Sequence, residues 1–557
     1  TNHISAISII IRSLLLQSGS VERNPGPEPN YLLLDAGTWN LDSILARDGI
    51  KKAYIESIQS VHNFDVFGIC ETYLSPRITP DDLLIEGFSQ APMRADHKNY
   101  TNRARGGVCL YFKDSIPIRR RPDLELLDET ICAEIKIDKK LIIYILSYRS
   151  PSQTPDEFLN YMEKLDCIYE KAISENPSLV ILNGDFNARS PLIWPDEKKQ
   201  TPEGKGIADF CTKNLLEQMV EEATHIPNDK TQTCIDLIMT NQPFLFVDKG
   251  VIPSPDPSLK HQIIYGKINF SVPCPPPHKR EVWDFKLAHT LAIRKQVALT
   301  PWEQIFHDNH IDTCVEIFTS KFLNIIRENI PNKVVTFDDR DAPWINPSLK
   351  NLIKKNRKTY SEWARNGKLP SFLEKVKHHQ IKTQEAIVNA KNRYINDLSK
   401  KLCDPSCGQK TFWSAYKRLS NKKKITNIPP LFENDKYIVN FKDKANIFNI
   451  YFAQQCQPFD IPSVLPPFVS LTSESIFNID FPLDKIISII TKLDSKKAHG
   501  FDGISAAMLK TCPYEIAIPL RLLYQKCILT GTFPAKWKHA NIQSVHKKNS
   551  RQVKTNY

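Results

Sequence analysis

The chain has 557 residues, of which 41% are hydrophobic and 24% are charged, and this composition excludes a fibrous or wholly disordered protein. At roughly 150 residues per domain, its length predicts two to four domains. The formal net charge of +12 is concentrated between Lys350 and Lys424, where 20 Lys and Arg residues stand against 5 Asp and Glu residues, a net charge of +15. From charge alone, this block fits a solvated helical face as well as a surface that binds nucleic acid. The 13 cysteines lack the spacing of a disulfide or zinc framework and predict reduced thiols in a cytosolic or nuclear protein.

The first 30 residues contain an apolar stretch followed by a short motif rich in proline and glycine. Ile4 to Leu16 is interrupted by Arg12 and is shorter than the ~20 residues that a membrane-spanning helix needs, so we expect no membrane anchor. Residues 19–27, Gly-Ser-Val-Glu-Arg-Asn-Pro-Gly-Pro, resemble a 2A-like ribosome-skipping peptide, in which the nascent chain separates before the last proline. Ser20 replaces the aspartate usual in that motif, and a turn leading into the next domain is the alternative.

From Leu32 onward, short β-rich runs alternate with helical periodicities. Strands are predicted at 65–70, 108–112, 131–137, 141–147, 179–182 and 235–239, and helices at 50–62, 156–174 and 206–217. This mixture lacks regular βαβ repeats and therefore predicts a layered α/β sandwich over residues 31–275.

The proline-rich run 272–277 predicts a linker between this domain and the rest of the chain. Residues 276–424 are expected to form a basic, mostly helical connector, and residues 425–557 to open a further α/β domain. Aromatic residues are interleaved with the basic ones and can either stack on unpaired bases or pack in a core, the second being expected for at least half of them. They are Tyr360, Trp363, Tyr394, Trp413 and Tyr416.

Polar side chains lie at the predicted strand ends or in the loops just after them. They are Asn40, Glu71, Tyr148, Asp185, Asn187, Asp236 and His261. Each has a structural explanation when taken alone, but together they supply what phosphodiester hydrolysis needs. Carboxylate oxygens bind a hard divalent cation, a carboxylate or histidine activates water, and amide, phenol and imidazole groups donate to the reacting phosphate. An Asp–His pair also fixes the imidazole tautomer.

Six short motifs carry a resemblance to a known family. They are Gly-Ile-Cys-Glu-Thr-Tyr-Leu (68–74), Arg-Gly-Gly-Val (105–108), Tyr-Arg-Ser-Pro (148–151), Gly-Asp-Phe-Asn-Ala (184–188), Cys-Ile-Asp-Leu-Ile (234–238) and His-Gln-Ile-Ile (261–264). In order and spacing they resemble the endonuclease/exonuclease/phosphatase family, and most closely its apurinic-endonuclease-like branch in non-LTR (LINE-type) retrotransposons. The resemblance covers residues 31–275 and implies a DNase I-like, four-layer α/β sandwich.

The resemblance implies that Glu71, assisted by Asn40, holds one Mg²⁺ or Mn²⁺ ion. It also implies that Tyr148 and Asn187 position the scissile phosphate. The first strand is irregular around Asp35-Ala-Gly37, just before Asn40.

The same resemblance implies roles in proton transfer. Asp185 would align or deprotonate the attacking water, or protonate the leaving oxygen. Asp236 would orient His261, which would stabilise developing charge or serve as the base. Lys260 stands where the family usually has Asp or another polar residue, which removes a possible second metal ligand.

The remaining segments resemble other parts of the same elements. Residues 342–350 are similar to the connector between endonuclease and polymerase, and residues 492–505 and 533–542 to the N-terminal finger region of the reverse transcriptase, with Phe501 in place of the usual proline. A polymerase also needs palm carboxylates for two metal ions. None follows Asp502, and Phe337-Asp-Asp339 precedes the finger region, so this chain as it stands is not expected to polymerise DNA.

These observations predict a metal-dependent endonuclease that nicks double-stranded target DNA in the nucleus for target-primed reverse transcription. Element RNA is expected as a second partner, bound through the basic connector. Two alternatives remain open. One is a decayed remnant that binds nucleic acid without cutting it, and the other is a phosphoesterase of the same superfamily with a different substrate.

Overall fold

The computed structural model describes residues 30–557 except 47–48, 89–90, 98–105, 138–139, 229–230, 275–277, 308–309, 338–341, 366–369, 421–427, 435 and 456–478. The apolar stretch and the 2A-like motif lie outside these residues. The described chain forms two compact units, a larger one that contains residues 30–274, 342–451 and 546–557, and a smaller one that contains residues 278–337, 452–455 and 479–545. No described helix is long and apolar enough to cross a membrane.

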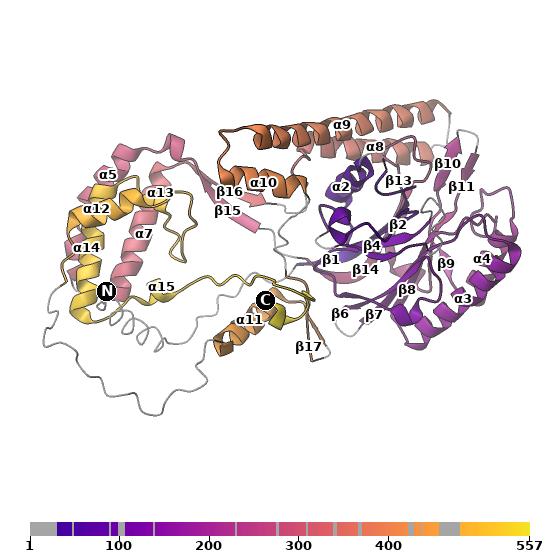
Figure 1. Ribbon diagram of the computed structural model, residues 1–557, viewed down its shortest axis with the longest axis horizontal. Coiled ribbons are helices and arrows are strands. Elements are labelled where there is room, and N and C mark those ends of the chain that lie inside the picture. Colours follow the sequence, from indigo (N-terminus) through magenta and orange to yellow (C-terminus); the bar gives the residue numbers. More distant parts are fainter. Residues whose placement is uncertain are drawn as a thin grey trace. The chain divides into compact units, whose positions relative to one another are not determined.

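Two six-stranded sheets form the centre of the larger unit (Figure 1). The first has the order β13 (Phe246–Ile252), β14 (Ile263–Cys274), β1 (Asn30–Asn40), β2 (Val66–Cys70), β4 (Val108–Phe112), β3 (Met93–Ala95). The second has the order β5 (Ile118–Arg120), β6 (Thr130–Ile137), β7 (Lys140–Tyr148), β8 (Leu179–Asp185), β12 (Asp236–Thr240), β9 (Glu217–Gln218). Each sheet contains one parallel pair, β1–β2 and β7–β8 respectively.

The central strands are buried on both faces, which explains why they read as continuous apolar runs. In β2, Val66 belongs to the core between the two sheets, whereas Phe67 and Ile69 belong to the core on the outer side. Gly68 in β2 leaves room for the facing sheet, since a Cβ added there would come 2.7 Å from Cδ1 of Leu146 in β7. The two sheets therefore pack face to face.

Helices cover both outer faces of the sheets. α2 (Ile50–His62) packs on the first sheet through Tyr54 and Ile58, and α3 (Pro155–Ser174) and α4 (Pro202–Lys213) pack on the second. α3 begins one residue before its predicted start, because Thr154 caps the helix and forms a capping box with Glu157. The four-layer α/β sandwich is confirmed.

The residues predicted as one basic connector, 276–424, are divided between the two units. Residues 278–337 belong to the smaller unit, whereas α8 (Pro347–Arg365) and α9 (Pro370–Cys403) pack against α2 in the larger one. The reason is that both helices are amphipathic and bury an apolar stripe. Tyr360 and Trp363 are core residues at 2% and 1% exposure, whereas Trp413 in α10 (Gln409–Leu419) is 54% exposed.

The predicted linker is also shorter than expected. Val272 to Cys274 continue strand β14 and pair with the start of β1. Proline has no backbone N–H to donate to a neighbouring strand. Pro273 is tolerated in β14 because β13 pairs with β14 only as far as Ile268, so beyond that point the edge of β14 that faces away from β1 has no partner strand.

The smaller unit is helical around one apolar core that includes Phe318, Phe322 and Ile516. Its elements are β15 (His278–Trp283), α5 (Thr290–Leu299), α6 (Trp302–His307), α7 (Ile311–Asn329), β16 (Asn332–Phe337), α12 (Leu483–Lys492), α13 (Ala506–Leu509), α14 (Pro513–Thr530) and α15 (Ala535–Lys538). The finger-like segment thus shares its core with α5–α7 from the predicted connector. The remaining elements are β10 (His225–Asn228), β11 (Thr231–Thr233), β17 (Leu431–Glu433), β18 (Lys436–Ile438) and α11 (Phe441–Gln455).

Candidate active site

The topology of the two sheets brings the predicted site residues to one edge of the sandwich. Asn40 ends β1 and Glu71 directly follows the parallel strand β2. Tyr148 and Asp185 are paired at the ends of the parallel strands β7 and β8. Asp236 begins the antiparallel strand β12 and pairs with Asp185. His261 precedes β14, which runs antiparallel to β1, so it reaches the same edge.

A single amide joins the first two carboxylates. Nδ2 of Asn40 donates to Oε1 of Glu71 and to Oδ2 of Asp185, each at 2.7 Å. Asn40 and Asp185 are buried at 2% and 0% exposure. In this arrangement the oxygen of Asn40 accepts from the backbone N–H of Asp42 at 3.2 Å. Asn40 therefore holds the two carboxylates together as a donor, and its predicted role as a metal ligand stays a prediction.

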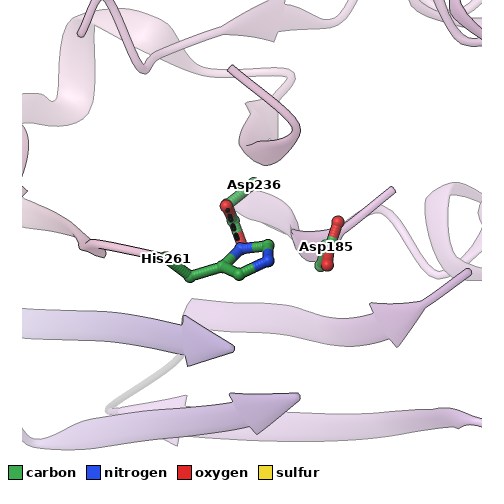
Figure 2. Close-up of side chains that lie close together, drawn as sticks. All are labelled: Asp185, Asp236 and His261. Atoms are coloured by element: carbon green, nitrogen blue, oxygen red, sulfur yellow. Dashed lines mark hydrogen bonds and ion pairs between the residues drawn. The ribbon is translucent and has the colours of Figure 1, made fainter. Parts of the chain in front are cut away.

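The second part of the site is the Asp–His pair. Nδ1 of His261 lies 3.0 Å from Oδ2 of Asp236, as Figure 2 shows, and the other edge of the imidazole faces Asp185. Ligand atoms of Asp185, Asp236 and His261 all lie within 4.8 Å of one another. The hydrogen bond to Nδ1 fixes the tautomer, so Nε2 is the nitrogen available to a substrate.

The electrostatics of this cluster favour proton exchange at neutral pH. Burial and the neighbouring Asp236 carboxylate raise the pKa of Asp185 to about 7. Burial lowers the pKa of His261, but the charge and hydrogen bond of Asp236 outweigh it and bring the pKa to about 9. The site therefore places a carboxyl group that can exchange a proton next to a charged imidazole.

The two predicted phosphate-positioning residues lie beside Asp185. Tyr148 is 7% exposed, and burial together with the charge of Glu71 raises the pKa of its phenol, which stays protonated as a donor. The backbone N–H of Asn187 donates to Oδ1 of Asp185 at 3.0 Å, and its side chain donates to the Arg149 carbonyl at 2.9 Å. Both residues are thus fixed within the cluster.

The backbone around the site adopts left-handed conformations that side chains other than glycine seldom take. Glu71, Tyr73 and Asn187 have φ values of +53°, +51° and +48°. Such conformations cost free energy and persist where the surrounding structure holds them, often at functional sites. At Glu71 the hydroxyl of Tyr73 contributes, because it donates to Oε2 of the carboxylate.

The sequence analysis missed several residues that support the site. Thr224 accepts from the backbone N–H of Asp236 at 3.0 Å. His225 packs on His261 with ring centroids 4.5 Å apart, and burial and the charge of His261 lower the pKa of His225 to about 4. Arg149, which is 2% exposed, donates to the carbonyls of Phe186 and Asn187. Only Arg149 had a sequence signal, since it lies inside the Tyr-Arg-Ser-Pro motif.

Glu129 is a further support, at the back of the site. Its carboxylate accepts from the N–H of Gly107 at 2.6 Å, and its carbonyl accepts from the N–H of Tyr148 at 3.0 Å. Gly106 and Gly107 in turn accept from the N–H groups of Tyr73 and Thr72, the two residues after Glu71. Glu129 therefore connects Tyr148 to the loop that carries Glu71. Arg105, the first residue of that Gly-Gly motif, lies outside the described residues.

The donor set fits a hard divalent cation. Glu71 and Asp185 present carboxylate oxygens on either side of one amide, and the carboxylate of Asp236 lies close to that of Asp185. Lys260 does not intrude, because its side chain is exposed.

Parts of the chain are similar to known proteins. Residues 142–265 match the endonuclease-reverse transcriptase family model. Among curated proteins, the chain is 28% identical over 135 residues to a putative 115 kDa protein of the type-1 retrotransposable element R1DM and 24% identical over 262 residues to the RNA-directed DNA polymerase from mobile element jockey, both from Drosophila melanogaster. These matches cover 24% and 44% of this chain but only 12% and 27% of the relatives.

Two similar solved structures are nucleases. The endonuclease domain of TRAS1, a telomere-specific non-LTR retrotransposon, is 15% identical, with 42% of this chain and 98% of that chain covered and a TM-score of 0.33. An AP endonuclease from Archaeoglobus fulgidus is 16% identical, with 43% and 100% covered and a TM-score of 0.32. Residues 142–265 are thus similar to the endonuclease–reverse transcriptase family, and the curated relatives that the chain matches come from mobile elements.

Proposed function

We propose that this protein nicks one strand of double-stranded DNA in a reaction that depends on Mg²⁺ or Mn²⁺, and leaves a 3′-hydroxyl that primes reverse transcription of a retrotransposon. The observation that carries the proposal is the convergence of Asn40, Glu71, Asp185 and the Asp236–His261 pair at one sheet edge. These residues come from five different strands or adjoining loops, and a structural role for each one separately would not bring them together.

Glu71 would hold the divalent cation, with Asn40 keeping its carboxylate and that of Asp185 at the same point. When bound, such a cation polarises the phosphate and offsets the negative charge that develops on it. Tyr148 and Asn187 donate hydrogen bonds to the phosphate oxygens and so orient it for in-line attack. The reaction requires that water adds to phosphorus while the bond to the 3′ oxygen breaks.

Two protons move in that reaction, one from the attacking water and one to the leaving oxygen. With a pKa of about 7, Asp185 can accept the first or donate the second at neutral pH. His261 is held by Asp236 with Nε2 free, and as an imidazolium it donates to the charge developing on the phosphate.

The substrate and cellular setting are proposed from the relatives and from charge. Both curated relatives come from mobile elements. The basic block of residues 350–424 is suited to the backbone of DNA or element RNA. Target DNA lies in the nucleus, where we propose that the protein acts.

A plasmid assay on the full chain tests the proposal. Supercoiled plasmid should be converted to nicked circles with Mg²⁺ and left intact with EDTA. Glu71→Gln should slow nicking by at least about 10²-fold, whereas Asp209→Asn, an exposed carboxylate on α4, should not. Nicking that persists in EDTA, or a chain that cleaves small phosphate esters but no plasmid, would refute the assignment.

A further inference from the structure

Two helices outside the segment that matches the family are built into the nuclease. α8 and α9 follow the first part of the smaller unit in the chain, yet they pack on the sandwich (Figure 1). Trp344, Ile353 and Ile387 are buried in the core that also contains Tyr54 of α2. The indole of Trp344 and the ammonium of Lys391 both donate to Oε2 of Glu56 in α2, at 3.0 Å and 2.9 Å. These helices are thus a fixed part of the larger unit.

Farther along, the same two helices contact the loops behind the Asp–His pair. The hydroxyl of Tyr360 in α8 donates to the carbonyl of Ala223 at 3.3 Å. The amide of Gln380 in α9 donates to the carbonyl of Ser254 at 3.1 Å. Tyr360 and Gln380 are buried at 2% and 7% exposure, so neither contact competes freely with water.

A short series of hydrogen bonds connects each of these two contacts to the Asp236–His261 pair. Ala223 precedes Thr224, whose hydroxyl accepts from the N–H of Asp236 at 3.0 Å and whose carbonyl accepts from the N–H of Gln262 at 2.7 Å. Ser254 donates its N–H to the side chain of Gln262 at 2.8 Å. Gln262 directly follows His261. The helices therefore restrain the backbone on which both members of the pair are mounted.

We propose that Tyr360 and Gln380 are positioning residues for the Asp236–His261 pair, and that residues 342–403 are a functional part of the endonuclease. The inference rests on the proposed nuclease function. A general acid–base pair works only when its geometry is held within about 0.5 Å, and residues behind the first contacts commonly provide that restraint. Residues 342–403 then support the catalytic pair in addition to connecting two parts of the chain.

Variants of the full chain separate positioning from simple packing. Tyr360→Phe keeps the buried ring and removes one hydroxyl, and Gln380→Met keeps the volume and removes the amide. Each should lower kcat for plasmid nicking by about 10-fold, as found when supporting partners of a site are lost, with KM for DNA unchanged. Tyr169→Phe is the matched control and should keep kcat, because it removes a buried hydroxyl that donates to the carbonyl of Asn214, between α3 and the end of α4.

Hydrogen exchange followed by mass spectrometry gives a readout that does not depend on activity. In Tyr360→Phe and Gln380→Met, peptides that cover 224–236 and 254–265 should exchange faster, whereas the Tyr169→Phe chain should match the wild type there. Unchanged exchange and unchanged kcat in both variants would overturn the inference. A wild-type chain that fails to nick would instead refute the proposed function, and the exchange data would still decide whether the helices restrain these loops.

Discussion

Asp236 and Asp185 face each other across neighbouring antiparallel strands, and Asp236 holds His261 between the two carboxylates. If Asp236 acts only through His261, removing either residue disables the same Asp–His pair. Asp236→Asn and His261→Ala should each slow nicking by at least about 10²-fold. The double variant should be no slower than the slower single variant, because residues that act as a unit are not additive. If the fold-loss of nicking rate in the double variant were the product of the two single losses, Asp236 and His261 would have independent roles.

The support given by Glu129 predicts a change in metal requirement. Glu129→Ala removes the acceptor for the Gly107 N–H and should loosen the loop that carries Glu71. The Mg²⁺ concentration for half-maximal nicking should then rise by about 10-fold. Glu129→Gln keeps an acceptor and should restore most of the affinity. Glu125→Ala, which breaks an ion pair with Arg120 elsewhere in the domain, should leave the Mg²⁺ titration unchanged. Equal effects of all three substitutions would contradict this role.

Gly184 precedes Asp185 and cannot carry a side chain. Its φ is +140°, and an added Cβ would lie 1.8 Å from the carbonyl oxygen of Ser147. Gly184→Ala should therefore lower the free energy of unfolding by at least about 2 kcal/mol. Gly408→Ala is the matched control, since a Cβ there meets nothing within 4 Å and φ is −62°. Thermal unfolding of the two variants should differ by several degrees, and equal melting temperatures would refute the argument.

Stability should fall on mild acidification because of His62. Burial and the adjacent Arg357 lower its pKa to about 3, and Arg357 donates to Nδ1 at 3.2 Å, so the folded state holds a neutral imidazole. The unfolded chain takes up a proton below about pH 6.5. The contribution is thus complete above pH 6.5 and is lost as the pH falls from there toward 3.

Urea denaturation at several pH values between 6 and 5 measures how the free energy of unfolding changes with pH. His62→Gln should remove roughly 1.4 kcal/mol per pH unit from the pH dependence of the free energy of unfolding. His378→Gln, on the exposed face of α9, should not alter the dependence. A slope that is the same in wild type and His62→Gln would mean that His62 is protonated in the folded state.

The sandwich was predictable because its strands carry strong local signals. The predicted strand 108–112 and helix 50–62 have the bounds observed for β4 and α2. Other boundaries shifted, as in α4, which was predicted at 206–217 and runs from Pro202 to Lys213, because Thr201 and Pro202 start the helix earlier. The extent of β1 and β14 was missed, since their long pairing depends on partners more than 200 residues apart.

At the candidate site too, local motifs were predictable, whereas contacts between distant parts of the sequence were not. The motifs locate Glu71, Asp185, Asp236 and His261, and the structure brings them together. The site is supported by Glu129, Thr224 and Tyr360. These residues act through hydrogen bonds to backbone groups, which leave no motif in the sequence. The division of the predicted connector, residues 276–424, between two units was equally hidden, because an amphipathic helix does not specify which core it covers.

The ends of the nicked strand test the central claim most directly. Full-length protein is incubated with supercoiled plasmid and Mg²⁺, and the nicked circles are then offered to a DNA polymerase with labelled nucleotides. The account predicts immediate extension from a 3′-hydroxyl, and loss of nicked product in His261→Ala. Extension that requires prior removal of a 3′-phosphate, or undiminished nicking by His261→Ala, would contradict it.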